Sequence, residues 1–429
     1  MKYKNVKYLM LISFILLSGI LVLFSSDPVY QIYGMVLLCI GAIIISGFDL
    51  IHPYFWYSTI FTLYSISYPI LYINEKNTLY GLSNQLMIMQ WLALVVFLII
   101  VTPTKVSRLT TLNFRRVSLL NKRLYQFLSI LIVLSVINIT RSGFSTKLDI
   151  YESGNIINII AFRAVLLLII LYIYRLTEKF LFNNQIDTGL IIKTGIVIML
   201  MVIFSGERDI LFRYVVITGL ILYYFKIIKN IHLPLLIPVA VIAMPLTHVY
   251  KYYFLDGTTR VSSLDANTNI FFEFLSGEFV TASRNLQVLI NNSSMTEGLY
   301  NGYTILNATL RTLFLDTDFS LISWYNDTFF PQLTKTGYGF TLVGEGYVNW
   351  GYWGIVIVFS IFGLFIKLLY KKSNKNIYYF TIYIYTIPIY MYSIRADLTN
   401  IFSPFVKQLL FSMLLIYIFN RIMIRSKKY

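Results

Sequence analysis

Apolar runs of about the length of a bilayer span follow one another along most of the chain, separated by short polar connections. Backbone groups in lipid need hydrogen-bond partners within their own segment, so runs this apolar are predicted to be helices. Twelve such runs are expected, at residues 7–24, 29–48, 54–73, 82–101, 123–140, 156–175, 189–205, 210–226, 232–250, 350–370, 377–394 and 401–420. The pattern predicts an all-α, polytopic integral membrane protein with about 12 transmembrane helices.

One long stretch, residues 251–350, carries too many charges to sit inside a membrane. The chain is therefore expected to divide into nine helices in residues 1–250, a loop at 251–350 and three helices in residues 351–429. Within the loop, residues 269–290 and 303–314 have apolar side chains at helical spacing. They are predicted to be short amphipathic helices that lie along the membrane surface.

The distribution of basic residues predicts the orientation of the chain. Only 13% of residues are charged, yet the formal net charge is +16. With a cytoplasmic N-terminus, most of the lysines and arginines fall on the cytoplasmic side, together with only three acids, Asp49, Glu178 and Asp187. Both termini are thus predicted to be cytoplasmic and the long loop to be outside. The basic character is explained by topology and gives no support to a nucleic-acid partner.

Charged residues at the ends of membrane helices are functional candidates, because burying them there is costly. Arg208 opens the eighth span and Arg213 follows one turn later. A guanidinium offers a fork of donors that matches phosphate oxygens, and the helix N-terminus adds favourable polarity. The alternative is an internal pairing, Glu207 with Arg208 or Asp209 with Arg213, that anchors the turn.

Four further arginines are candidates for binding an anion. Arg395 stands two residues before Asp397 in the connection between the last two spans, where a structural alternative is a snorkelling arginine beside a capping aspartate. Arg163 lies early in the sixth span. Arg284 and Arg311 are in the long loop and rank below Arg208, because loop arginines have more ways to be structural.

The loop closes with a run rich in glycine and aromatic residues around Glu345. Its glycines allow close approach of the backbone, and its aromatic rings offer flat faces of the kind that stack on sugars, although an interfacial aromatic belt explains some of them. Tyr347 and Asn349 are expected to hold an acceptor beside Glu345, which is the candidate general base. No grouping of His, Cys and carboxylates has metal-ligand spacing, so neither a metal nor a cofactor is predicted.

The layout resembles that of the bacterial oligosaccharide repeat-unit polymerases, the O-antigen and capsule polymerases of the Wzy family. The likeness rests on a large outer loop late in the chain, on Ser205-Gly206-x-Arg208 opening a helix, and on Gly339-Phe340-Thr341 followed by Glu345-x-Tyr347-x-Asn349-x-Gly351-x-x-Gly354. Arg208 matches the helix-opening arginine of that family and Glu345 its loop-end acid. Some relatives, notably the ligases, carry a loop histidine, which this loop lacks.

The resemblance implies a C-type membrane glycosyltransferase in the bacterial cytoplasmic membrane, with its site facing the exterior. It would transfer a growing glycan from undecaprenyl pyrophosphate to a new lipid-linked repeat unit, without a metal or a nucleotide sugar. Its expected partners are these lipid-linked glycans, membrane lipids, a chain-length regulator and a flippase. Two alternatives remain open: a lipid-linked oligosaccharide flippase, which should lack so long a loop and place charges deep in the bundle, and an O-antigen ligase, which differs in its acceptor.

Overall fold

The computed structural model describes residues 2–76, 80–102, 118–142, 156–205, 208–228, 270–313, 315, 319–332 and 338–426. None of these residues is in a strand, which confirms the all-α prediction for this part of the chain. The predicted span at 232–250 lies outside the described residues. Every other predicted span coincides with a helix or with a continuous series of helices.

Six of the described helices are long and apolar enough to cross a membrane, namely Asn5–Leu23, Pro28–Ser46, Asn84–Val101, Lys122–Arg141, Leu342–Lys372 and Thr399–Ile418. Large apolar side chains remain exposed on these helices, for example Leu9 and Leu16 on the first of them. Such surfaces are unfavourable in water and match the hydrocarbon of a bilayer. The chain is accordingly a helical protein with the character of a membrane protein.

The chain forms two compact units. The first contains residues 1–106, 268–371 and 390–403. Its elements are α1 (Lys2–Leu23), α2 (Pro28–Ser46), α3 (Pro53–Ile73), α4 (Asn84–Val101), α11 (Ile270–Phe274), the π-helix η3 (Leu275–Phe279), α12 (Val280–Asn291), α13 (Ser293–Thr296), α14 (Tyr303–Thr312), α15 (Leu321–Phe329), α16 (Leu342–Lys372) and α18 (Thr399–Ser403).

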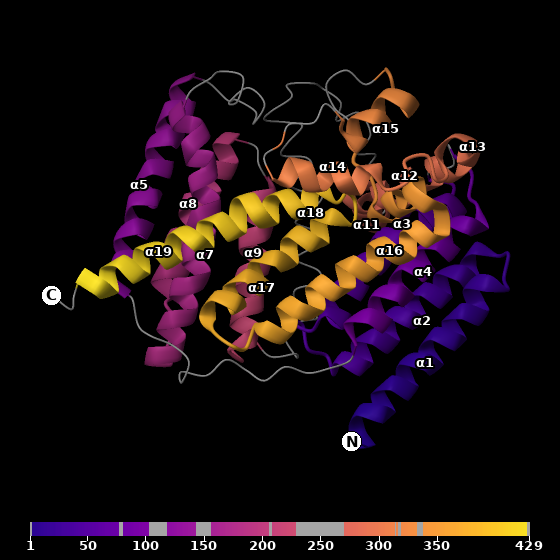
Figure 1. Cartoon of the computed structure of the whole chain (residues 1–429), viewed down its shortest axis with the longest axis horizontal. Coiled ribbons are helices and arrows are strands. Elements are labelled where there is room, and N and C mark those ends of the chain that lie inside the picture. Colours follow the sequence, from indigo (N-terminus) through magenta and orange to yellow (C-terminus); the bar gives the residue numbers. More distant parts are fainter. Residues whose placement is uncertain are drawn as a thin grey trace. The chain divides into compact units, whose positions relative to one another are not determined.

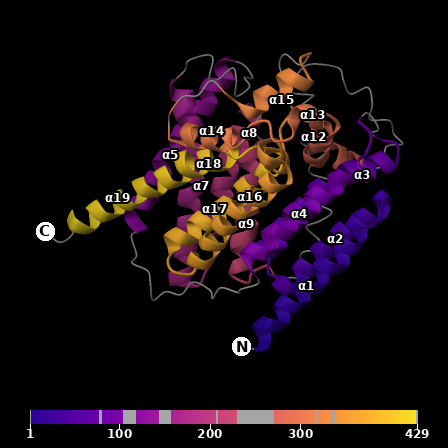
Figure 2. The same ribbon diagram turned by 45° about the vertical axis from the view of Figure 1, so that its right-hand side comes forward.

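Local sequence signals explain where the first helices begin and end. In α2, the Asp27 carboxylate accepts a hydrogen bond from the Val29 backbone N–H at 2.9 Å, and Pro28 occupies the first turn. Gly47, with φ of 71°, ends the helix in the left-handed conformation. Helices α1 and α2 consequently form a hairpin whose two arms lie side by side (Figures 1 and 2).

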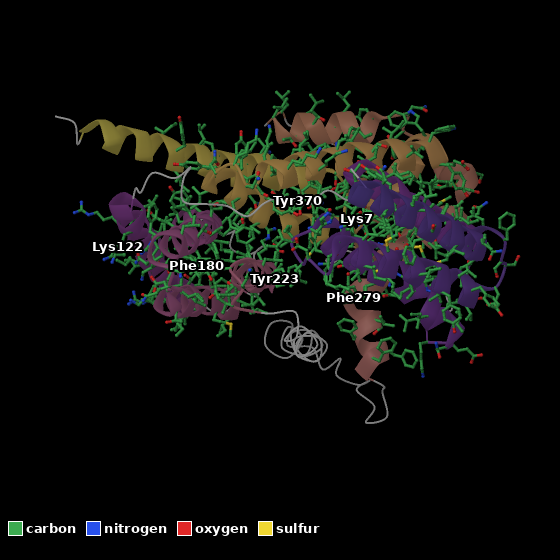
Figure 3. The ribbon with its side chains drawn as sticks, turned by 90° about the horizontal axis from the view of Figure 1, so that it is seen from below. Lys7, Lys122, Phe180, Tyr223, Phe279 and Tyr370 are labelled. Carbon is green, nitrogen blue, oxygen red and sulfur yellow. The ribbon has the colours of Figure 1, made fainter. Side chains whose placement is uncertain are left out.

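Aromatic side chains build much of the core of the first unit. Tyr57 of α3 packs against Phe97 of α4, with ring centroids 3.9 Å apart, and against Phe362 of α16 at 5.1 Å. The loop helices join this core through Phe279, labelled in Figure 3, whose ring centroid lies 5.0 Å from that of Tyr64. The two amphipathic stretches predicted within the loop are therefore confirmed as helices, and α12 packs on α3.

The second unit contains residues 107–267, 372–389 and 404–429. Its described elements are α5 (Ser118–Ser142), α7 (Ile156–Asn183), α8 (Thr188–Ser205), α9 (Arg208–Tyr224), most of α17 (Ile377–Ser393), the π-helix η4 (Pro404–Leu410) and α19 (Phe411–Ser426). Buried hydroxyl pairs link its helices, for example Tyr125 with Thr194 at 2.8 Å and Tyr172 with Thr218 at 2.9 Å. Phe180, labelled in Figure 3, stacks on Phe225 with centroids 4.0 Å apart.

Helix α16 differs from the sequence prediction at its start. The predicted span began at residue 350, because the glycines before it favour a loop. The helix instead begins at Leu342 and is interrupted by non-helical backbone at Trp350 and Gly351. This interruption separates a short arm, Leu342–Asn349, from the apolar arm that is long enough to cross a membrane. The short arm carries Glu345.

Candidate active site

The kink in α16 is built by glycines. Gly351 has φ of +58°, a left-handed conformation that glycine adopts without strain. Gly346 and Gly354 approach so closely that a Cβ on Gly354 would collide with the carbonyl of Gly346. The two arms thus meet backbone to backbone, which no side chain at these positions would allow.

The kink also frees backbone carbonyls that other parts of the loop then bind. The Gly298 N–H donates to the Tyr347 carbonyl at 3.2 Å, and the Tyr300 N–H donates to the Val348 carbonyl at 2.9 Å. Because buried backbone groups must be paired, these bonds fix the segment before α14 alongside the short arm. The N-terminus of α14 is thereby brought next to Glu345.

Glu345 is tied to two other segments through its carboxylate. The hydroxyl of Thr304, in the first turn of α14, donates to Oε1 at 2.8 Å. The backbone N–H of Leu398, just before α18, donates to Oε2 at 2.6 Å. Figure 1 shows α14 and α18 next to one another, as these bonds require. One carboxylate therefore joins α14, α16 and the turn before α18.

Asn349 completes this network. Its Nδ2 donates to the Thr304 hydroxyl and to the Glu345 carbonyl, both at 2.7 Å, while its Oδ1 accepts from the Gly302 N–H at 2.8 Å. Glu345, Asn349 and Thr304 are all buried, so each of their polar groups needs such a partner. The predicted neighbours Glu345 and Asn349 do lie together, but Asn349 supports the carboxylate through Thr304.

A second buried carboxyl group, that of Asp397, lies close enough to Glu345 to interact with it electrostatically. It accepts hydrogen bonds from the Asn400 backbone N–H at 3.1 Å and from the Asn400 side chain at 2.7 Å. Arg311, in the last turn of α14, lies close enough to interact with Asp397 electrostatically. Glu345 and Asp397, both singled out in the sequence, thus form an acid pair beside Arg311.

Burial makes this pair hold a proton at neutral pH. Glu345 stands before the kink, in the stretch that the sequence assigns to the outer loop, and its side chain is 1% exposed. Burial raises its pKa to about 8, and the neighbouring Asp397 carboxylate adds to that rise. Burial also raises the pKa of Asp397, against the hydrogen bonds from Asn400 and the charge of Arg311. A carboxyl group with such a pKa can take up and release protons near neutral pH.

Arg284 of α12 is a half-buried cation with no carboxylate partner among the described residues. Its guanidinium lies 4.2 Å from the centroid of the Tyr338 ring, and its Nε has no hydrogen-bond partner in the described part of the chain. The contact with Asn285 is long, at 3.5 Å. An arginine in this state has donors left for an anion.

Arg395 lies beside the same backbone as Arg284. The Asn285 side chain donates to the Gly339 carbonyl at 2.7 Å, and a Cβ on Gly339 would stand 2.7 Å from the Arg395 carbonyl. Arg395 itself packs over the Tyr392 ring at 4.6 Å. Arg395 and the Leu398 N–H that binds Glu345 belong to one turn, so the loop backbone connects the two arginines to the acid pair in a cluster around Glu345. Within this cluster the guanidinium groups of Arg284 and Arg395 lie over Tyr338 and Tyr392.

Tyr347 is not presented to solvent as a stacking face. It is 1% exposed, and its hydroxyl donates to Glu297 at 3.3 Å. Phe340 is likewise buried, whereas Trp353 is largely exposed on the apolar arm of α16. In this structure Tyr347 shapes the kink and the loop around it, and contact with a sugar would need the loop to move.

The remaining predicted arginines belong to the second unit. Arg213 is buried and pairs with Asp209 at 2.6 Å and with Gln408 at 3.1 Å, which is the internal pairing that the sequence left open as an alternative. Arg208 begins α9 as predicted, but its side chain lies outside what the structure describes. Arg163 is exposed on α7, and the structure gives it no ion-pair partner in the described part of the chain.

Two features of the site were not apparent from the sequence. One is the hydrogen bond from Thr304 to Glu345, and the other is the proximity of Arg311 to Asp397. The one available signal was that α14 carries small polar residues opposite its apolar stripe, and it is this polar side, with Thr304, Asn307 and Thr312, that is buried. Within the described residues, no group of three or more His, Cys, Asp or Glu side chains could hold a metal ion.

Comparison of the chain with models of protein families, with curated proteins and with solved structures finds no match in any of the three.

Proposed function

We propose that this chain is a membrane-embedded glycosyltransferase that polymerises glycan repeat units carried on undecaprenyl pyrophosphate. The proposal includes a C-type architecture with twelve spans and a site on the outer face of the bacterial cytoplasmic membrane. The product is an O-antigen or a capsular polysaccharide. The motif resemblance around Arg208 and Glu345 supports this assignment, and so does the cluster at the end of the loop.

One observation carries the proposal: the turn 394–398 supplies both Arg395 and the hydrogen bond to Glu345, with Arg284 alongside. Transfer from a lipid pyrophosphate needs cations for the leaving group and a base for the acceptor hydroxyl, and it needs them close together. The cluster combines half-buried guanidinium groups with a carboxyl group whose pKa is near neutral.

In the proposed reaction, the acceptor hydroxyl oxygen forms a bond to the anomeric carbon as the bond from that carbon to the pyrophosphate oxygen breaks. Glu345 takes the hydroxyl proton. Arg284 and Arg395 stabilise the negative charge that develops on the departing pyrophosphate, with Arg208 proposed from the sequence for the same role. Because Glu345 is buried, α14 or the turn before α18 moves to admit the acceptor.

The test is polymerisation in liposomes containing the purified protein and a synthetic lipid-linked repeat unit. Arg284→Ala should lower the rate about 10²-fold, as expected for loss of a donor to a developing charge. Arg284→Lys keeps the charge but loses the fork, so it should also be impaired. Arg141→Ala, at an exposed arginine of α5, is the matched control and should polymerise normally. A wild-type rate and chain-length distribution from Arg284→Ala would contradict the proposal.

A gene deletion separates this function from the two alternatives. Loss of a polymerase leaves a single repeat unit attached to its surface anchor, whereas loss of a flippase or a ligase leaves none attached. Gel analysis of the surface polysaccharide should therefore show the single-unit form. Its absence would favour the flippase or the ligase.

A further inference from the structure

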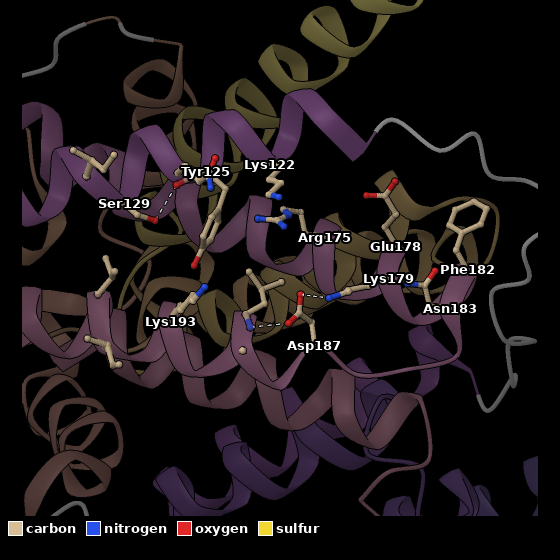
Figure 4. Close-up of a pocket in the computed structure, with 16 residues that line it drawn as sticks. Lys122, Tyr125, Ser129, Arg175, Glu178, Lys179, Phe182, Asn183, Asp187 and Lys193 are labelled. Atoms are coloured by element: carbon tan, nitrogen blue, oxygen red, sulfur yellow. Dashed lines mark hydrogen bonds and ion pairs between the residues drawn. The ribbon is translucent and has the colours of Figure 1, made fainter.

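A cavity of about 1100 Å³ opens between α5, α7 and α8, and every residue that lines it belongs to the second unit. Figure 4 shows its charged residues converging from three helix ends: Lys122 from the start of α5, Arg175 and Lys179 from the end of α7, and Lys193 from the first half of α8. No step of the proposed polymerisation uses these residues.

The two acidic residues of the cavity are already engaged. Asp187 accepts a hydrogen bond from Lys179 at 2.6 Å and caps α8 by accepting from the Leu190 N–H at 3.0 Å (Figure 4). Glu178 is 5% exposed and so has little surface to offer a ligand. Both acids also interact electrostatically with Arg175, so among the described residues they leave only Lys122 and Lys193 of this cavity uncompensated.

Lys122 and Lys193 line the cavity with exposed side chains, and neither has an acidic partner among the described residues. Arg175 lies over the Tyr125 ring, 5.0 Å from its centroid, which holds the guanidinium at the cavity wall. The Tyr125 hydroxyl is itself fixed by Thr194 at 2.8 Å. Two uncompensated lysines and a partly compensated arginine thus face one space, an arrangement suited to phosphate oxygens.

Apolar side chains line the rest of the cavity, among them Ile130, Phe182 and Ile196, all exposed. A small soluble phosphate would leave these side chains uncovered. An amphiphile covers both parts, with its phosphate on the cations and its acyl chains along α5 and α8. Lys122–Arg141 is one of the helices apolar enough to cross a membrane, so lipid is available at this place.

We propose that the cavity between α5, α7 and α8 is a binding site for an anionic phospholipid, whose phosphate lies against Lys122, Arg175 and Lys193. All three residues are on the side that the distribution of basic residues predicts to be cytoplasmic. Anionic lipid is concentrated in that leaflet and is attracted by clustered lysine and arginine side chains.

The test measures binding of fluorescent phosphatidylglycerol to the detergent-solubilised full-length protein, with fluorescent phosphatidylcholine as the neutral comparison. The wild-type protein should prefer phosphatidylglycerol. The double variant Lys122→Ala/Lys193→Ala should bind it roughly ten- to thirtyfold more weakly, since each basic residue at a membrane surface contributes up to about a fivefold factor in affinity. Both lysines are exposed, so the variant should fold normally, which its melting temperature checks.

The double variant Arg123→Ala/Lys371→Ala is the matched control, because it removes the same charge from exposed positions that do not line the cavity. It should bind phosphatidylglycerol as the wild-type protein does. Equal weakening in both double variants, or in neither, would overturn the proposal. So would equally tight binding of soluble glycerol 3-phosphate with the same dependence on Lys122 and Lys193, because the ligand would then be a free phosphate.

Discussion

At the scale of single residues, hydrogen bonds offset part of the cost of burying Glu345. An ionised carboxylate without partners is very unfavourable in a protein interior. Here Thr304 and the Leu398 N–H each donate to one of its oxygens. Those donors favour the charged form, yet burial and Asp397 outweigh them, so the pKa of Glu345 still rises to about 8. The residue is held near its point of titration.

Glu345→Gln should abolish polymerisation without unfolding the protein. A glutamine can accept from the Leu398 N–H through its oxygen and donate to the Thr304 hydroxyl through its nitrogen, so the three segments stay joined. It cannot take up a proton. We expect no polymer in the liposome assay and a melting temperature close to that of the wild type. The control is Glu75→Gln, at an exposed carboxylate of the same unit, which should be fully active.

The pH dependence of the wild-type protein follows from the same pKa. The base must be deprotonated, so kcat/KM should rise about tenfold per pH unit below pH 8 and level off above it. Asp397→Asn removes a charge that raises the pKa of Glu345 and should move the rise to lower pH. A flat wild-type profile between pH 6 and 9 would show that Glu345 is not the base.

Sequence reasoning found several of these residues but not their contacts. It selected Glu345 and Asp397 because charged residues at the ends of spans are costly, and Asn349 because it stands beside Glu345 in the closing run of the loop. It also allowed for the pairing of Asp209 with Arg213, since residues four apart on a helix face each other. It could not predict the contacts of Glu345 with Thr304 and Leu398, because these residues are 41 and 53 positions away in the sequence and no local pattern indicates that they come together.

At the scale of secondary-structure elements, the kink in α16 determines where the short arm points. The predicted spans coincide with helices even where the apolar run contains glycine, as in α2 with Gly34 and Gly41, because a long apolar run favours a helix there. They failed at 342–349, where Gly344 and Gly346 indicated a loop. Packing against α14 and the turn before α18 provides the stabilisation that helix propensity lacks.

Gly354→Ala should disrupt this kink. The added methyl group would collide with the Gly346 carbonyl, so the two arms must separate. We expect a loss of stability of about 1–3 kcal/mol, the usual cost of overpacking, together with loss of polymerisation. Gly219→Ala is the control, because no atom lies within 4 Å of the new methyl group in α9. Thermal unfolding of both variants in one detergent measures the difference, and equal melting temperatures would show that the close approach is dispensable.

The sequence predicted helix α14 correctly but did not predict which of its sides is buried. Its apolar stripe includes Leu306 and Leu313, which are 56% and 61% exposed, whereas Thr304 and Ala308 are buried. For a helix in water the pattern would predict the reverse. The outward apolar side fits the expectation that this helix lies along the membrane surface.

At the scale of the whole molecule, the distribution of basic residues predicts which ends of the helices face the cytoplasm. Two described connections are predicted to lie on opposite sides of the membrane. The segment before α14 belongs to the predicted outer loop, and the connection between α16 and α17 is predicted to be cytoplasmic. The single cysteine, Cys39, is buried, so its background reaction should be small.

Met295→Cys and Lys375→Cys test this topology. Both positions are exposed. A membrane-impermeant thiol reagent added to spheroplasts should label the cysteine at 295 and leave the one at 375 unlabelled until the membrane is permeabilised. The reverse pattern would invert the topology and place the cluster around Glu345 inside the cell.

The bond between Glu345 and Leu398 also sets an order of biosynthesis. A ribosome completes α14 and the short arm of α16 long before it reaches residue 398, and α17 must be made in between. Until that helix has been made, Oε2 of Glu345 lacks the Leu398 N–H as its donor, and Asp397 has not yet been synthesised. The nascent chain therefore carries an incomplete site. A product that terminates early, within α17, would contain the apolar helices of the first unit but would lack the turn 394–398 that connects Glu345 with Arg395.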